Sequence, residues 1–360
     1  MSPTVDALRL DWETYVSDAE SRVPGVRIED GGEIVALGEL SPGCRACKDG
    51  TWDCVFLTMR CNLACPFCCS PHDIPPDYAG SAFGRTPSEI TAAYARTRIT
   101  GVSFSGGEPF LDPSRLLEWV GQFTARRPDA YYWVYTNGLL ADEETLRRLG
   151  ELGVDEIRFN AAASGYDHPT LIRNMSAAAR LVAGVTVEIP AIPAHGPRLL
   201  ASLKRWCSAG VKYLNLHELL CEPGTNSAGL PGRPVITEDL HVTAIDPASR
   251  RLTLEVMEMV AREGLPLSVN DCSLQSKLRQ VRGRRRCLAP LTRAPWEMAV
   301  GDSVYETTCA FVDDIGYRFF RPDQADQMRA RYPGHSFVRL ARTAPLSLAD
   351  PGRWVVFEAI

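Results

Sequence analysis

Two patterns of hydrophobic residues alternate along the middle of this chain, one typical of strands and the other of helices. Short apolar runs, with the length and composition of buried strands, occupy residues 54–58, 101–105, 131–135, 156–159, 185–189 and 213–216. Amphipathic stretches with helical spacing lie between them, at residues 114–125, 142–152, 174–183 and 197–209. Because strands that alternate with helices form βα units around a parallel sheet, this pattern predicts an α/β fold over residues 51–225.

The segment before this region, residues 1–50, follows a different pattern. It begins with a helical stretch, and alternating apolar positions at residues 26–29 and 33–37 then predict a small hairpin. Cys44 and Cys47 follow in a C-x2-C arrangement that we interpret as a turn. The pair is either a metal-ligating turn or two free thiols, and the spacing alone leaves both interpretations open.

The segment after it, residues 226–360, starts with a Pro- and Gly-rich stretch that predicts a linker or lid at residues 229–234. The following pattern predicts a helix at residues 251–263, a strand at 266–270 and a basic helix at 272–286. That basic run is either a solvated face or a site for a carboxylate or phosphate, groups that suit arginine. Apolar groups at residues 311–312, 317–320 and 354–357 predict a small strand-containing cap that folds back over the central domain.

Composition and charge narrow the class of protein. The chain has 360 residues, of which 45% are hydrophobic and 23% charged, enough to bury a large core. A net charge of -5 gives no sign of a nucleic-acid partner, and no segment has the length of a membrane span or the pattern of an export signal. We therefore expect a cytoplasmic protein without a nucleic-acid or membrane partner, in a reducing compartment that suits its 12 cysteines.

A cysteine loop directly follows the first predicted strand. Cys61, Cys65 and Cys68 have C-x3-C-x2-C spacing, with a further thiol at Cys69. Three soft thiolates in one short loop can bind a 4Fe-4S cluster and leave one iron open for chemistry. Zinc sites usually need two separated ligand pairs, and disulfide frameworks belong mainly to short secreted chains, so both alternatives fit less well.

A glycine turn follows the second predicted strand. The strand at residues 101–105 runs into Gly106, Gly107, Glu108 and Pro109. Glycines let a backbone approach a ligand closely, and the carboxylate and nearby carbonyls can receive an ammonium group. The turn is therefore a candidate binding site for an amine-bearing cofactor.

These two motifs, in this order and spacing, resemble those of the radical S-adenosylmethionine superfamily. The resemblance implies a partial (β/α)6 barrel with Cys61, Cys65 and Cys68 as ligands of a 4Fe-4S cluster. It also implies that S-adenosylmethionine binds near Phe67, with its ammonium group at Gly106, Gly107, Glu108 and Pro109. Reduced by a donor such as flavodoxin or ferredoxin, such a site generates a 5'-deoxyadenosyl radical that takes hydrogen from a small-molecule or peptide substrate. We expect a small biosynthetic substrate here.

The ends of the later strands carry further candidates. By the same resemblance, Asn160 and Ser164 stand where the family holds the ribose and carboxylate of its cofactor, and Ile192 stands at an edge suited to adenine. Asn137 either contacts the cofactor or belongs to a helix-capping turn, and Glu188 lines the cofactor or forms an internal ion pair. The candidate catalytic residues are His217 and Glu218, although a histidine in this position can also be a hydrogen-bonded structural residue.

Several segments suggest a particular branch of this superfamily, and some of the cysteines suggest a second metal centre. Cys44 and Cys47, together with segments 187–193, 215–218 and 272–286, look like a branch described as related to pyruvate formate-lyase activating enzymes. No cobalamin-binding domain precedes the barrel, so we do not expect methyl transfer through cobalamin. Cys54 lies within the first strand, and a second metal centre would join Cys44 and Cys47 to two of the C-terminal thiols Cys272, Cys287 and Cys309. The alternative is that these are buried core thiols.

Two rival functions also follow from these motifs. One is an activase that generates a glycyl radical on a partner protein. The other is a non-catalytic iron-sulfur or zinc scaffold, for which the glycine turn would have no purpose. Cleavage of S-adenosylmethionine by the reduced protein separates the enzyme from the scaffold.

Overall fold

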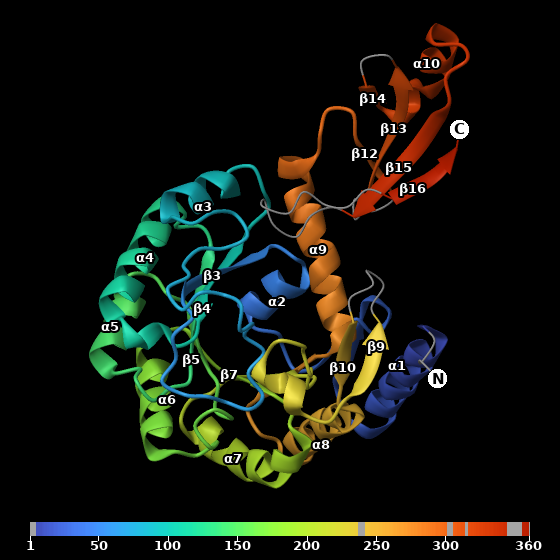
Figure 1. The fold of residues 1–360 in the computed structure, drawn as a ribbon. Coiled ribbons are helices and arrows are strands. Elements are labelled where there is room, and N and C mark those ends of the chain that lie inside the picture. The colour runs from blue at the N-terminus through green and yellow to red at the C-terminus, as the bar shows by residue number, and fades with distance from the viewer. Residues whose placement is uncertain (1–4, 237–241, 301–304, 314–315, 344–354, 360) are drawn as a thin grey trace.

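A nine-stranded sheet forms the body of the protein. The computed structural model describes residues 5–236, 242–300, 305–313, 316–343 and 355–359. Strand order in the sheet is β1-β2-β11-β8-β7-β6-β5-β4-β3, curved into the ring seen in Figure 1. Six adjacent parallel strands make up most of it: β3 (Trp52–Thr58), β4 (Gly101–Gly106), β5 (Tyr131–Thr136), β6 (Glu156–Phe159), β7 (Gly184–Pro190) and β8 (Tyr213–His217). The predicted partial (β/α)6 barrel is therefore confirmed.

Helices cover the outer face of these strands. They are α3 (Pro87–Tyr94), α4 (Pro113–Arg126), α5 (Glu143–Glu151), α6 (Pro169–Leu181) and α7 (Gly196–Ser208). Side-chain caps fix where they begin: the carboxylate of Asp112 accepts from the backbone of Arg115, and that of Asp142 from Thr145. Helix α6 begins five residues earlier than predicted, because Pro169 is favoured in a first helical turn.

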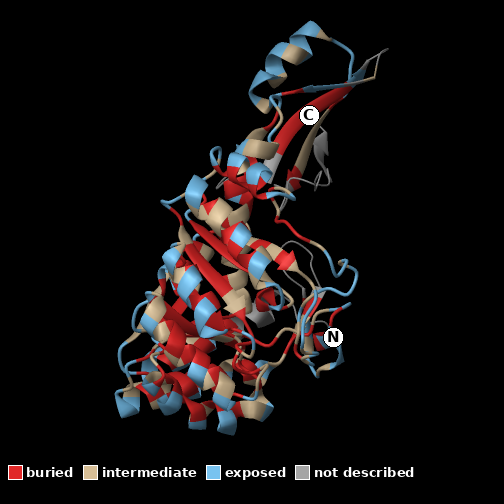
Figure 2. Ribbon diagram, turned by 90° about the vertical axis from the view of Figure 1, so that its left-hand side faces the viewer, coloured by how far each residue is buried: buried red, intermediate tan, exposed pale blue. Residues whose placement is uncertain are grey.

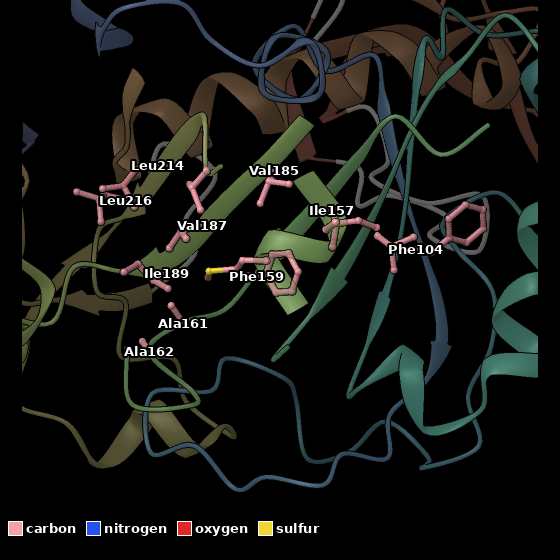
Figure 3. Packing of buried hydrophobic residues seen from close by; sticks show 14 of the residues in the cluster. Phe104, Ile157, Phe159, Ala161, Ala162, Val185, Val187, Ile189, Leu214 and Leu216 are labelled. Atoms are coloured by element: carbon pink, nitrogen blue, oxygen red, sulfur yellow. The ribbon is translucent and has the colours of Figure 1, made fainter. Parts of the chain in front are cut away.

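The main core lies between the strands and this helical layer. Every second strand residue points outward into it, among them Phe104, Ile157, Phe159, Val187 and Leu214, all of them 0% exposed (Figure 3). Each such side chain contributes about 1.5–3 kcal/mol through burial. The remaining strand residues point into the barrel interior, where the polar groups of the site lie.

Three strands from outside the predicted barrel region extend the sheet. Strand β11 (Ser268–Cys272) pairs in parallel with β8, and β2 (Ile34–Leu37) pairs antiparallel with β11. The predicted hairpin is confirmed, since β1 (Val26–Glu29) pairs antiparallel with β2. One continuous sheet thus crosses the predicted boundaries near residues 50 and 225, with α1 (Val5–Arg22) and α8 (Pro247–Glu263) packed together on its outer side.

The segment with Cys44 and Cys47 is a helix, so its prediction as a turn is wrong. Helix α2 (Pro42–Lys48) starts with Ser41, whose hydroxyl accepts from the backbone of Cys44, and with Pro42 in the first turn. It lies inside the ring in Figure 1 and contacts β3, β4 and β5. A Cβ on Gly43 would come within 2.5 Å of the Arg158 guanidinium. Because α2 leads directly into the start of β3, it plugs the amino-terminal end of the barrel.

Helix α9 (Leu274–Thr292) spans the gap between the two edges of the sheet. On one side Arg284 pairs with Asp53 of β3 at 2.5 Å, and on the other Arg279 and Arg282 pair with Glu33, next to β2. These three arginines of the basic run therefore pair with carboxylates of the chain itself. They form neither a solvated face nor a site for an external anion. Helix α9 crosses the end of α2 at Gly283, where a Cβ on Gly50 would come within 2.2 Å of its carbonyl carbon.

The predicted linker contains a short hairpin. It consists of β9 (Arg233–Ile236) and β10 (Val242–Ile245), and the 3-10 turn η4 (Asn226–Gly229) precedes it. In the described part of the chain, no helix is both long and apolar enough to cross a membrane.

A small antiparallel sheet follows α9, which confirms the predicted strand-containing C-terminal unit. Its elements are β12 (Met298–Val300), β13 (Tyr305–Asp313), β14 (Gly316–Phe320), α10 (Ala325–Arg331), β15 (Phe337–Thr343) and β16 (Val355–Ala359). It has its own core around Cys309, Phe311, Phe320 and Phe337. Figures 1 and 2 show this unit projecting away from the barrel, so the expectation that it folds back over the barrel is wrong. Trp354, in the last predicted apolar group, lies outside the described residues.

Candidate active site

The cysteine loop and the glycine turn are joined by backbone hydrogen bonds. The N–H of Gly107 donates to the carbonyl oxygen of Thr58 (2.7 Å), and that of Glu108 to Arg60 (2.9 Å). Gly106 has a φ of +132°, and a Cβ there would come within 1.9 Å of the Thr58 oxygen. A Cβ on Gly107 would come within 2.1 Å of the Arg60 oxygen. Both glycines are therefore needed so that the cysteine loop can lie directly on the turn, a reason that the sequence alone did not reveal.

The three thiols of the loop are free and face solvent to different extents. Cys61 is exposed, while Cys65 and Cys68 are half-buried. The Leu63 N–H points at the Cys61 sulfur (3.4 Å), and the backbone of Cys68 donates to that of Cys65 (3.1 Å). Burial and the neighbouring thiols raise the pKa of Cys65 to about 11, so in the metal-free chain this thiol is protonated.

This donor set fits an iron-sulfur cluster. A bound metal deprotonates its thiol ligands and removes the repulsion between them. Within the described residues, no three Cys, His, Asp or Glu side chains surround a position for a single metal ion. A four-iron cube differs from a single ion because each thiolate binds a different iron, so its ligands stand farther apart. Cys61, Cys65 and Cys68 would hold such a cluster.

A segment after β8 is bonded to the cysteine loop. The Asn226 amide donates to the carbonyl of Cys65 (2.9 Å), and the Ser227 N–H to that of Cys68 (3.2 Å). His72, just beyond the loop, contacts the Asn226 side chain through its Nε2 (2.9 Å). Sequence reasoning missed this contact, because residues 224–227 carry no motif and their partners lie more than 150 positions away.

Glu108 is buried and bonded to the end of β5. Its carboxylate accepts from the backbone of Asn137 (2.7 Å), the hydroxyl of Thr136 (2.9 Å) and the backbone of Phe110 (3.1 Å). Burial raises the pKa of Glu108, and these three donors oppose that rise. The residue therefore braces the site, and its predicted contact with the cofactor ammonium stays a prediction.

The other predicted cofactor residues lie around the same edge of the barrel, because β4 to β8 are parallel. Asn137 donates from its side chain to Asn62 in the cysteine loop (2.7 Å), and Asn160 accepts from the backbone of Ala163 (3.2 Å). Ser164 is half-buried, whereas Phe67, Pro109, Asn137 and Ile192 are buried. The structure brings these residues to one rim, and their individual roles stay predictions.

A polar network crosses the barrel interior. Arg158, 1% exposed in its side chain, pairs with Glu156 (2.8 Å) and with Glu188 (2.6 Å). Glu188 in turn lies 2.7 Å from the Nε2 of His217. Burial by itself would raise the pKa of Glu188, but Arg158 and the His217 hydrogen bond hold that pKa well below its usual range. The internal ion pair that the sequence left open for Glu188 is thus present, and Arg158 was missed because an arginine inside a short apolar strand carries no motif.

His217 and Glu218 lie on opposite sides of the sheet. His217 points into the barrel interior with 29% of its side chain exposed, and burial lowers its pKa. Glu218 points outward, where its carboxylate accepts from the backbone of Leu274 at the start of α9 (2.7 Å). These contacts give Glu218 a structural role; the catalytic role predicted for it has no support from its position.

The thiols outside the triad are distributed over separate parts of the protein. Cys44, Cys47, Cys54 and Cys272 belong to the barrel interior, and burial raises the pKa of each of them. Cys309 lies in the core of the C-terminal sheet. Cys47 lies close enough to Cys44 and to the C-terminal Cys272 for both to contribute to the rise in its pKa, after burial. No three of the described Cys, His, Asp or Glu side chains surround a position for a single metal ion, and a second centre at Cys44 and Cys47 stays a prediction.

Comparison with known proteins identifies the central region. Residues 55–186 match the Radical SAM superfamily. A Methanocaldococcus jannaschii protein, provisionally named a glycyl-radical enzyme activating enzyme, is 28% identical over 50% of this chain and 50% of its own. The PqqA peptide cyclase of Gluconobacter oxydans is 36% identical over 29% of this chain and 28% of its own. The chain thus spans half or less of the length of these relatives.

Solved structures match at low identity. SuiB of Streptococcus suis, solved with S-adenosylmethionine, is 12% identical over 61% of this chain and 49% of its own, with a TM-score of 0.44. Methylornithine synthase is 14% identical over 76% of this chain and 83% of its own, with the same TM-score of 0.44.

Proposed function

Because residues 55–186 form a radical SAM domain, we propose that the chain is an enzyme that cleaves S-adenosylmethionine reductively at a 4Fe-4S cluster. When bound, the cluster and cofactor would supply a radical able to take a hydrogen atom from a substrate held in the barrel interior. One observation carries this proposal: the cysteine loop and the glycine turn lie side by side at the carboxyl-terminal rim, joined through Thr58 and Gly107. Active sites of such barrels lie at that rim.

The chain's own residues would hold the cluster and orient the cofactor. Cys61, Cys65 and Cys68 would bind three irons, and the glycine turn would receive the methionyl end of the cofactor. Asn226 and Ser227 keep the cysteine loop in place through its carbonyl oxygens.

The fold supports a reaction shielded from water. Helix α2 plugs the amino-terminal end of the barrel, and α9 joins the two edges of the sheet. A radical intermediate needs such a site, since exclusion of water prevents side reactions. With both routes closed, substrate would enter from the rim that carries the cysteine loop.

His217 is the residue that we propose to contact the substrate. Because Glu188 is ionised and lies 2.7 Å from Nε2, that nitrogen carries the ring proton and donates it. Nδ1 is then an acceptor for a proton or a hydrogen bond from the substrate. Arg158 and Glu188 are positioning residues for this ring.

The test is the cofactor reaction itself. Anaerobically reconstituted protein, reduced with dithionite or with flavodoxin and its reductase, should convert S-adenosylmethionine into 5'-deoxyadenosine, measured by liquid chromatography and mass spectrometry. Protein reconstituted without iron is the control. If the loaded and reduced protein yields no 5'-deoxyadenosine above that control, the proposal is wrong.

A second candidate is an activase that makes a glycyl radical on a partner protein. The observation that favours it is the similarity to the Methanocaldococcus jannaschii protein over half of both chains. Co-expression with the products of neighbouring genes and electron paramagnetic resonance would show a stable glycyl radical. A doublet that depends on Cys61 would favour the activase over an enzyme with a small substrate.

A further inference from the structure

Lys277 lies at the barrel rim, in the first turn of α9. That helix begins directly after β11, with the hydroxyl of Ser273 accepting from the backbone of Ser276 (3.3 Å). Strand pairing sets Cys272, the last residue of β11, beside His217, the last residue of β8. Gln280, one turn beyond Lys277, donates to the Cys272 sulfur (3.6 Å). Residues three apart share a helix face, so Lys277 faces the edge where Cys272 and His217 lie.

Lys277 is half-buried, and its ammonium group has no ion-pair or hydrogen-bond partner among the residues that the structure describes. Glu218 is close enough for the charge of Lys277 to oppose the rise in pKa that burial causes in this carboxyl, but none of the described carboxylates forms an ion pair with the ammonium group. Glu188 pairs with Arg158 and His217, Asp271 pairs with Arg250 (3.2 Å) on the outer side, and Glu218 accepts from the start of α9. In agreement with this placement, burial lowers the pKa of His217 and the charge of Lys277 adds to that effect, while for Cys272 the same charge opposes the rise in pKa that burial causes.

A second lysine adds positive charge at the same place. Lys48, the last residue of α2, is 1% exposed, and its ammonium donates to the carbonyl of Asp271 (3.1 Å) and to the hydroxyl of Ser276. Neither acceptor is a carboxylate of the protein. Partly buried charges are normally paired. Neither lysine forms an ion pair with a carboxylate, so this rim carries positive charge that a negative group could pair with.

We propose that Lys277 binds an anionic group of the substrate, a carboxylate or a phosphate, at the rim beside His217. The proposal deepens the proposed function, since it rests on the barrel interior being the substrate cavity. An anion at Lys277 would make a charge-assisted hydrogen bond and place the rest of a small molecule above His217. The substrate class is therefore a small acid or phosphate ester.

Two alkylating reagents of similar size test this site without turnover. Iodoacetate carries a carboxylate and iodoacetamide a neutral amide; in both, a ring nitrogen or thiolate attacks the methylene carbon and iodide leaves. Reconstituted full-length protein is treated with each reagent, and modification at His217 and Cys272 is measured by peptide mass spectrometry. Cys207, half-buried on the outer helix α7, is the internal reference. We expect the ratio of modification by iodoacetate to modification by iodoacetamide to be about tenfold higher at His217 and Cys272 than at Cys207. One contact of about 1.4 kcal/mol gives a factor of this size.

Matched variants and competitors complete the experiment. Lys277→Met should bring the rim ratio down to that of Cys207, while Lys277→Arg should keep it raised. Acetate and inorganic phosphate, added separately, should protect His217 and Cys272 in wild-type protein, and the stronger competitor identifies the anion. The proposal is overturned if wild type and Lys277→Met give equal modification ratios at the rim. It is also overturned if neither reagent modifies His217 or Cys272. Neither result depends on cleavage of S-adenosylmethionine, so failure here is distinct from failure of the proposed function.

Discussion

Gly107 donates its backbone N–H to the carbonyl oxygen of Thr58 at 2.7 Å, a contact that holds the end of β4 against the start of the cysteine loop. Neither residue is a ligand or an ionisable group. Their contact nevertheless determines where three thiols stand relative to the glycine turn. The first prediction follows from the space around this contact.

Gly106→Ala should prevent the cysteine loop from taking its position. The added Cβ would come within 1.9 Å of the Thr58 oxygen at a φ of +132°, so backbone must move, at a cost of about 2 kcal/mol or more. We expect iron content per chain and thermal stability both to fall. Gly121→Ala in α4 is the control, because the nearest atom to its Cβ would be 3.5 Å away. Full iron loading of Gly106→Ala would contradict the close contact.

Replacing the triad thiols one at a time separates cluster ligands from neighbours. Cys61→Ala, Cys65→Ala and Cys68→Ala should each lower iron content and reduce 5'-deoxyadenosine formation to background, because each thiolate holds a different iron. Cys69→Ala is the matched control, since Cys69 is exposed and adjacent. Equal losses in all four variants would mean that the triad is not the ligand set.

Glu108→Gln should disturb both stability and cofactor binding. The carboxylate accepts from three donors, and an amide would turn an N–H toward one of them. We expect a loss of about 1–3 kcal/mol in the free energy of unfolding, measured in urea, together with weaker binding of S-adenosylmethionine. Unchanged stability with weaker binding would show that the residue acts only on the cofactor.

Arg158→Met should leave the buried carboxylates Glu156 and Glu188 without their guanidinium partner, although each keeps neutral hydrogen-bond donors. Loss of one partner from a buried network costs about 3–5 kcal/mol at pH 7. Arg147→Met, which breaks two exposed ion pairs on α5, is the control and should change the free energy of unfolding far less. Urea unfolding followed by circular dichroism measures both values, and similar small losses would show that the network contributes little.

The same variant has a defined pH dependence. The pKa of Glu188 is held below its usual range in the folded protein, so its stabilising effect is present above the unfolded pKa of about 4.3 and is lost as the pH falls. Wild-type protein should therefore lose stability progressively as the pH falls below about 5, in part through this group. In Arg158→Met the contribution of Glu188 should shrink or reverse, because the depressing charge is gone. An identical pH profile for both proteins would exclude the ion pair as its cause.

The parts that the sequence predicts well are local. A strand such as Glu156–Phe159 is defined by its own apolar residues, and the spacing of Cys61, Cys65 and Cys68 requires no knowledge of the rest of the chain. Both anchor motifs therefore appear where they were expected, at the carboxyl ends of adjacent strands.

The parts that it does not predict depend on partners far along the chain. Ser41 and Pro42 are a helix-start signal that could have identified α2, but the short segment was interpreted as a turn because of its two cysteines. Nothing local shows that β2 pairs with β11, or that arginines of α9 find carboxylates near the N-terminus. The sequence therefore predicted a solvated face or an anion site for the basic run of α9, whereas its arginines pair with carboxylates of the chain itself.

The closure of the barrel by α9 also constrains how the protein is made. Arg284 and its partner Asp53 are 231 positions apart, so the ribosome must synthesise most of the chain before the two edges of the sheet can be joined. Until then the nascent sheet keeps its edges unpaired, and such long-range closure is slow. The cysteine loop, by contrast, emerges soon after Asp53 and stays accessible throughout. Delivery of iron and sulfide can thus precede the sealing of the barrel, and a chain truncated before α9 should expose an edge strand that favours aggregation.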